Sequence, residues 1–180
     1  MNGERTYPDE PAGPFLEPPF SFQDADSRSI EIRPADHEEE ALVTMYRAFD
    51  PADRAQGIPP TGERRIREWL EVILDEGPDV AAYHGDAIIG HATLVPDGTG
   101  AYELAIFVLA DYQHAGIGTR LIEGLLGLGS TRGIERVWLT VERWNTPAID
   151  LYRKVGFETV DAESFELEMS LRLSEASVPA

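Results

Sequence analysis

With 180 residues, the chain is long enough for one domain with its own hydrophobic core. It contains no cysteine, which excludes disulfides and cysteine-ligated metal sites. Its net charge of −18, with Lys154 as the single lysine, repels the phosphate backbone and argues against a nucleic-acid partner.

The acidic residues are spread along the whole chain, which has 33 Asp and Glu against 15 Lys and Arg. This distribution favours a halophilic surface, on which salt screens the self-repulsion, over an acidic face for one basic partner. No apolar run is long enough to span a membrane, and the first residues lack the basic-then-apolar pattern of a signal peptide. We therefore expect a cytoplasmic protein without a membrane partner.

Proline and acidic residues dominate residues 1–27, which predicts a flexible tail. The alternative is that its apolar side chains dock on the domain: Phe15, Leu16, Phe20 and Phe22. The folded domain is predicted over residues 28–173, followed by a second tail at 174–180.

Alternating and helical apolar patterns divide the first half of the domain into elements. They predict a strand, two helices and a β-hairpin, at residues 29–33, 37–49, 62–76, 80–83 and 87–95. Asp36 is expected to cap the first helix, and residues 51–61 are expected to form a loop.

The second half of the domain is organised around residues 101–131. Residues 102–109 are apolar and partly β-branched, which predicts a buried strand, and the leucines after Thr119 have helical spacing. Further along, the pattern predicts a strand, a helix and two strands, at 137–141, 145–156, 157–160 and 165–171. The element order is β-α-α-β-β-β-α-β-α-β-β, which indicates an α+β fold with a mixed sheet.

A glycine-rich turn, Gln-His-Ala-Gly-Ile-Gly-Thr at residues 113–119, joins the central strand to its helix. Such a joint presents several backbone N–H groups at a helix N-terminus, which binds phosphate without a basic side chain. The alternative is a plain turn. The segment lacks the third glycine of a dinucleotide fingerprint and the Gly-Lys-Ser/Thr of a Walker loop.

Two sequence blocks resemble the GNAT N-acetyltransferase superfamily. The first is the Gln-x-x-Gly-x-Gly turn after the strand that ends near Val108, which resembles the superfamily's acetyl-CoA loop. The second, at residues 145–157, is similar to its Asn-x-x-Ala-x-x-x-Tyr-x-x-x-Gly-Phe motif. The blocks come in the family's order and at its spacing, and the family pattern covers residues 29–171.

The resemblance implies a mixed, mostly antiparallel central sheet with helices on both faces, and acetyl-CoA as a cosubstrate. It places the cofactor contacts in the two blocks, at Phe107, Val108, Leu109, Gln113, His114, Ala115, Gly116, Ile117, Gly118, Thr119, Asn145 and Tyr152. Two of these contacts have alternatives. Asn145 also suits a helix cap, and His114 also suits a solvated loop.

Acetyl transfer from a thioester to an amine needs a base for the ammonium and an acid for the leaving thiolate. In GNAT enzymes the tyrosine of the second block commonly acts as general acid, which assigns that role to Tyr152; the alternative is a core aromatic. Glu103 is the candidate base, because burial in an apolar strand raises the pKa of a carboxyl group. The alternative for Glu103 is a solvent-facing charge or a partner for an arginine.

The central strand and loop also resemble the acetyltransferase domain of bacterial and archaeal protein lysine acetyltransferases, in which a glutamate at the position of Glu103 is catalytic. Residues 49–54 resemble the segment after the first helix of those domains. The arginine usual in their loop is replaced here by His114-Ala115.

Together these features predict an acetyl-CoA-dependent N-acetyltransferase that passes the acetyl group directly to a primary amine, with a protein lysine among the acceptors. A small amine or a protein N-terminus is the alternative acceptor. A non-catalytic acyl-CoA-binding sensor is the alternative from another class. The four histidines are scattered without metal-ligand spacing, so we predict no metal site. We expect a monomer or a homodimer.

Overall fold

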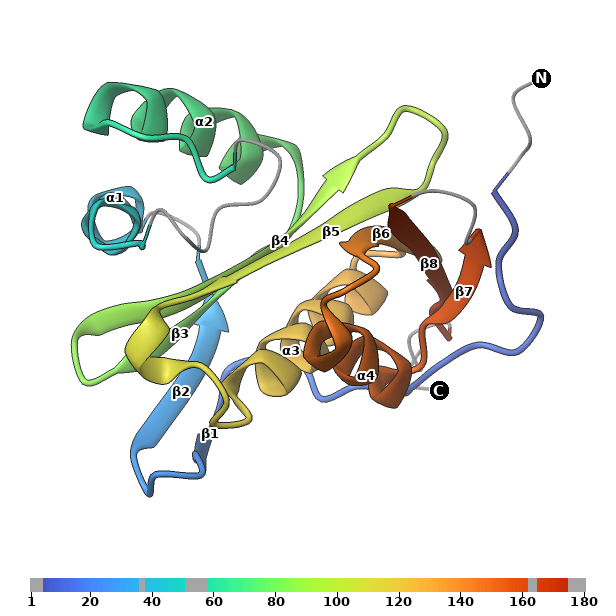
Figure 1. Cartoon of the computed structure of the whole chain (residues 1–180), viewed down its shortest axis with the longest axis horizontal. Coiled ribbons are helices and arrows are strands. Elements are labelled where there is room, and N and C mark those ends of the chain that lie inside the picture. The colour runs from blue at the N-terminus through green and yellow to red at the C-terminus, as the bar shows by residue number, and fades with distance from the viewer. Residues whose placement is uncertain (1–4, 36–37, 51–57, 162–164, 175–180) are drawn as a thin grey trace.

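The computed structural model describes residues 5–35, 38–50, 58–161 and 165–174 of the chain. Its strands form one sheet in the order β1-β2-β3-β4-β5-β6-β8-β7 (Figure 1). The strands are β1 (Phe20–Gln23), β2 (Ser29–Pro34), β3 (Asp79–His84), β4 (Ala87–Pro96), β5 (Tyr102–Val108), β6 (Arg136–Glu142), β7 (Glu158–Asp161) and β8 (Glu166–Arg172). Every neighbouring pair is antiparallel except β5 and β6, which are parallel.

Helices cover both faces of this sheet (Figure 1). They are α1 (Glu39–Arg47), α2 (Glu63–Glu76), α3 (Ile117–Thr131) and α4 (Thr146–Val155), with a short 3-10 turn, η2 (Ala110–Tyr112), before α3. One apolar cluster joins α1 and α2 to Tyr83, Ile88 and Phe107, and a larger one joins α3 and α4 to the opposite face. This architecture confirms the predicted α+β fold with a mixed, mostly antiparallel sheet.

Sequence periodicity explains how the helices meet the sheet. On α2, Ile66, Leu70 and Ile73 recur at helical spacing and are buried. On α3, glycines permit a close approach to neighbouring backbone. A Cβ on Gly127 would lie 2.5 Å from the carbonyl oxygen of Leu16, so only glycine fits where the N-terminal segment passes.

The described part of the N-terminal segment, residues 5–27, corrects the prediction of a flexible tail, and residues 1–4 of that predicted tail lie outside the described residues. β1 pairs with β2 from Phe20 opposite Ile32 to Gln23 opposite Ser29. Ala12 forms a further bridge with Leu173 at the other end of the sheet. The prediction was wrong for this segment because an edge strand of four residues, placed among prolines, gives too short an alternation to recognise.

The alternative, in which apolar residues of the segment dock on the domain, holds for Phe15, Phe20 and Phe22, which pack against the larger apolar cluster. It fails for Leu16, whose side chain is 62% exposed. The predicted cap Asp36 lies outside the described residues, as do residues 51–57 of the predicted loop.

Candidate functional site

The sheet opens between β5 and β6. Both strands lie wholly within the described residues, and they pair at two positions, Tyr102 opposite Val137 and Glu103 opposite Trp138. By contrast, β4 stays paired with β5, and β8 with β6, along the length of these strands. Beyond Glu103 the two central strands therefore diverge, as Figure 1 shows.

The divergence leaves backbone groups of β5 facing the gap. The N–H of Leu109 donates to the carbonyl of Ile89 on β4 at 3.0 Å. Because backbone groups alternate sides along a strand, Phe107 and Leu109 bond towards β4, whereas Ile106 and Val108 turn towards β6. The carbonyl of Val108 accepts from the Gln113 amide at 3.0 Å. The N–H groups of Ile106 and Val108 consequently face the gap without a ladder partner on β6.

The glycine-rich turn lies at the end of β5 and begins α3. Gly116 has a φ of +85°, and a Cβ placed there would meet nothing within 4 Å. Ala115 and Ile117 are buried, which anchors the turn, while His114 and Gly116 are exposed. The first N–H groups of α3 have no partner within the helix, and Gly116 offers no capping side chain, so this helix end can accept an anion.

Three elements converge at Gly118. A Cβ on this residue would lie 3.2 Å from Leu151 on α4 and 3.8 Å from Ile106 on β5. The start of α3, the gap edge of β5 and the helix that carries Tyr152 are therefore in contact.

The two residues predicted in the second block have clear structural surroundings. Asn145 caps α4, since its side-chain oxygen accepts from the N–H of Ala148 at 3.4 Å. Tyr152 is 9% exposed, and its ring contacts Phe157 with centroids 5.9 Å apart. Burial raises the pKa of Tyr152 to about 12, so its hydroxyl stays protonated at neutral pH.

Glu103 is half-buried at the point where β5 and β6 part. It lies two residues from Ala105 and four from Phe107, so it shares their face of β5, the face that α1 and α2 cover further along. Burial raises the pKa of Glu103 above the usual value, and the positive charge of Arg5 opposes this rise. Asp97, Glu166 and Glu168 raise it further through their negative charges.

A hollow of about 390 Å³ lies on the same side, between the end of α1 and the start of α2. Tyr46 and Phe49 line it, and their ring centroids lie 5.6 and 6.0 Å, respectively, from the ring centroid of Phe107. The hollow thus approaches β5 from the face that carries Glu103, opposite the face covered by α3 and α4.

Sequence reasoning missed a buried polar chain beneath this hollow. The ring of His91 links Asp79 to Tyr46. Its Nε2 lies 2.7 Å from a carboxylate oxygen of Asp79, and its Nδ1 lies 2.6 Å from the hydroxyl oxygen of Tyr46. These two contacts tie α1 to strands β3 and β4 of the sheet. No local spacing indicates such a contact, because the residues come from three different elements.

Among the described residues, no group of three or more His, Cys, Asp or Glu is arranged to hold a metal ion. Within the same residues, no helix has the length and apolar character needed to cross a membrane.

Comparison with known proteins agrees with this geometry. The family model of the acetyltransferase (GNAT) family matches residues 39–157. Mycothiol acetyltransferases are similar in sequence. The protein from Saccharomonospora viridis is 32% identical over 142 residues, which is 72% of this chain and 45% of its own length. The protein from Thermobifida fusca is 30% identical over 164 residues, which is 85% of this chain and 50% of its own length. The chain spans about half the length of these curated relatives.

Solved structures share the fold. The GNAT domain of S. lividans PAT has a TM-score of 0.75 at 18% identity, covering 86% of this chain and 97% of that domain. The PaiA N-acetyltransferase from Thermoplasma acidophilum was solved in complex with coenzyme A. It has a TM-score of 0.59 at 22% identity, covering 79% of this chain and 98% of that protein. By sequence and by fold, the chain belongs to the acetyltransferase (GNAT) family.

Proposed function

We propose that this protein is an acetyl-CoA-dependent N-acetyltransferase that passes the acetyl group directly to a primary amine. The observation that carries the proposal is the gap between β5 and β6, with the open N-terminus of α3 at the end of β5. Strand-edge N–H groups and a helix N-terminus together suit a ligand that has an amide-containing arm and a phosphate end.

In this proposal the pantetheine arm lies along the gap edge of β5. The N–H groups of Ile106 and Val108 bond its amides, and the turn at residues 113–119 binds the pyrophosphate through backbone N–H groups. The side chain of Gln113 does not reach the cofactor in this arrangement, because it holds the carbonyl of Val108. It instead fixes the angle at which β5 leads into the turn.

We propose that the hydroxyl of Tyr152 donates a hydrogen bond to the sulfur as the thiolate leaves. A thiol has a pKa near 8.5, roughly three to four units below the value of about 12 that burial gives Tyr152. Proton transfer to a free thiolate is therefore uphill, and the hydroxyl acts mainly as a hydrogen-bond donor that stabilises charge developing on sulfur.

Glu103 is proposed to remove a proton from the acceptor amine, directly or through water. Its half-buried position raises its pKa towards neutrality, which improves a carboxylate as a base. The amine enters from the face that carries Glu103 and the hollow near Phe107. The acceptor class we propose is a primary amine, either a protein lysine or a small amine, in a cytoplasm of high salt.

The first test concerns the phosphate site. Acetyl-CoA at a hundredfold excess over its dissociation constant should stabilise the folded protein by about 2.7 kcal/mol, measured as a thermal shift. Gly116→Asp should remove most of this shift, because it places a negative charge beside the phosphate. Gly133→Asp is the matched control, since Gly133 has a φ of +83° and equally open surroundings at the other end of α3. Equal shifts in both variants would contradict the site.

The second test concerns Tyr152. Tyr152→Phe should lower kcat by about 10²–10⁴ while leaving acetyl-CoA affinity unchanged, because the lost hydrogen bond acts in the transition state. Tyr83→Phe, on β3, should leave kcat unchanged. If the Tyr152 variant keeps the wild-type kcat, the tyrosine is a packing residue. A wild-type protein that binds acetyl-CoA but transfers nothing to any amine would indicate a sensor.

The third test concerns pH. A general base must be ionised to accept a proton. The raised pKa of Glu103 therefore places the acidic limb of the pH profile of kcat/KM above pH 4.5, the usual pKa of glutamate. Arg5→Gln should move this limb to higher pH, because the positive charge that favours the carboxylate is lost. Glu103→Gln should abolish the limb and recover rate only at high pH, where the amine is already neutral. An unchanged profile in Glu103→Gln would show that another group removes the proton.

A further inference from the structure

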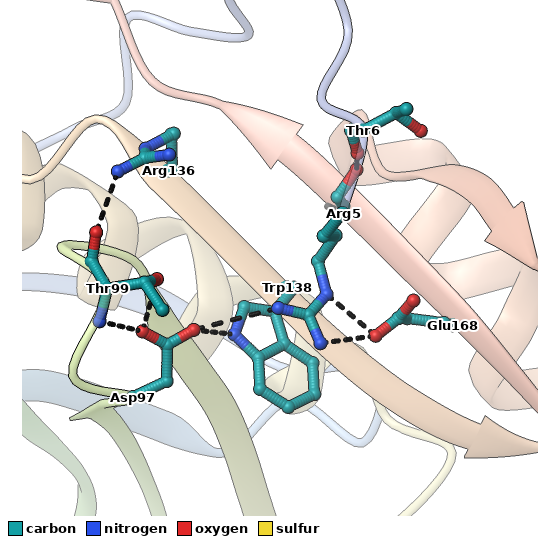
Figure 2. Close-up of polar contacts among 8 residues, drawn as sticks. Arg5, Thr6, Asp97, Thr99, Arg136, Trp138 and Glu168 are labelled. Carbon is teal, nitrogen blue, oxygen red and sulfur yellow. Dashed lines mark hydrogen bonds and ion pairs between the residues drawn. The ribbon is translucent and has the colours of Figure 1, made fainter. Parts of the chain in front are cut away.

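The chain's own N-terminal segment covers part of the face that carries Glu103. Two side chains of β8 hold its backbone. Ser170 donates to the carbonyl of Thr6 at 2.7 Å, and Arg172 donates to the carbonyl of Pro8 at 3.0 Å. This segment brings Arg5 over the outer face of β6 (Figure 2).

Arg5 occupies a site built from three side chains, Asp97, Trp138 and Glu168, which we call the guanidinium seat (Figure 2). The central carbon of the guanidinium lies 3.6 Å from the ring centroid of Trp138. Its Nε and Nη2 lie 2.6 and 2.5 Å from one oxygen of Glu168, and its Nη1 lies 3.6 Å from Asp97. Stacking on an indole and contact with two carboxylates are what a planar cation prefers.

Two of the three side chains of the seat, Asp97 and Trp138, are held in place without help from Arg5. Asp97 accepts from the N–H and the hydroxyl of Thr99 at 2.8 and 2.6 Å, and from the indole N–H of Trp138 at 2.9 Å. Although burial alone favours its protonated form, the hydrogen bonds from Thr99 and Trp138 and the charge of Arg5 keep the pKa of Asp97 below its usual value. The carboxylate and the indole therefore keep their places when the cation leaves.

The charge of the seat exceeds that of its occupant. One guanidinium faces the carboxylates of Asp97 and Glu168, and Glu103 also lies within electrostatic range of Arg5. The side chain of Arg5 remains 23% exposed, and those of Asp97 and Glu168 remain 14% and 24% exposed. The seat is therefore mostly buried but keeps an edge in contact with solvent, from which another cation can approach.

The position of the seat connects it to the proposed chemistry. Trp138 stands opposite Glu103 at the last pair before β5 and β6 diverge. A molecule whose amine reaches Glu103 therefore has the seat beside it, on the acceptor side of the sheet.

We propose that the guanidinium seat is a subsite for the acceptor, and that Arg5 fills it as a tethered competitor. This inference rests on the proposed acetyl transfer and names the acceptor class as a primary amine that also carries a guanidinium group. The acceptor is either a small guanidino-amine or a peptide with an arginine near the reacting amine. Binding of the acceptor's guanidinium displaces Arg5 and places the amine near Glu103.

The binding test needs neither acetyl-CoA nor turnover, so it can fail independently of the proposed function. The chain has three tryptophans, and their indole N–H signals can be followed by NMR after assignment with Trp138→Phe. Nα-acetyl-arginine amide should shift the Trp138 signal in Arg5→Gln. Its dissociation constant for this variant should be at least about tenfold lower than for wild type, because the tethered Arg5 side chain of wild type competes at high effective concentration. The neutral isostere Nα-acetyl-citrulline amide should not bind.

Two further variants sharpen this test. Arg64→Gln removes an exposed arginine that pairs with Glu68 on α2, and it should behave as wild type. Glu168→Gln, added to Arg5→Gln, should abolish binding. If Arg5→Gln does not fold, Arg5→Met serves instead, because methionine keeps an unbranched side chain and has no charge that competes for the seat. Equal binding of the arginine and citrulline amides, or no gain over wild type, would show that the seat only anchors the N-terminal segment.

Turnover then identifies the source of the guanidinium. In Arg5→Gln, 4-guanidinobutylamine should be acetylated with a higher kcat/KM than its neutral counterpart 4-ureidobutylamine. A lysine peptide with a neighbouring arginine should exceed its citrulline version in the same way if the acceptor is a protein. Whichever pair shows the larger ratio gives the acceptor class, and ratios of one in both pairs would overturn the acceptor assignment even if the seat binds arginine.

Discussion

The structure depends on one constraint, which is that β5 cannot pair with both of its neighbours along its whole length. β4 holds it from Tyr102 to Val108, while β6 is held by β8 and pairs with β5 at only two positions. Backbone N–H and C=O groups that leave a ladder need other partners. The carbonyl of Val108 accepts a hydrogen bond from the side-chain amide of Gln113. Other backbone groups remain at the edge of the gap, where an extended ligand can take the place of the missing strand.

The same divergence organises the chemistry on the two faces of the sheet. On one face, α3 and α4 meet at Gly118, which brings the proposed phosphate site at the start of α3 next to the helix that carries Tyr152. On the other face, Glu103 stands at the point where the strands part, within range of the charges around the guanidinium seat. The positive charge of Arg5 keeps the pKa of Glu103 lower than burial alone would set it, and in our proposal the guanidinium of the acceptor takes over this effect when it replaces Arg5.

Much of this arrangement was predictable from sequence. The strands and helices from residue 29 onward follow local periodicity, and the two glycine-containing blocks are continuous in the chain. The cap formed by Asn145 also follows from its place before the Thr146-Pro147 start of α4. Local patterns carry such features because the residues that form them are neighbours.

What the sequence could not predict is made by residues that are far apart. The guanidinium seat combines Arg5 with Asp97, Trp138 and Glu168, and no spacing rule links them. β1 was missed because its apolar alternation covers only Phe20 and Phe22. The hydrogen bond from the Gln113 side chain to the carbonyl of Val108 was likewise not predictable, because the motif fixes the position of Gln113 and not the partner of its amide; its predicted contact with the cofactor stays a prediction.

The central claim is that the edge of β5 left open by β6 is where the cofactor binds, and amide NMR during a titration with coenzyme A tests it most directly. We expect the largest amide shifts at Ile106 and Val108 and at residues 116–119. The amides of Phe107 and Leu109 bond towards β4 and should change less. Shifts confined to the hollow between α1 and α2, with the β5 edge and the turn unaffected, would contradict it.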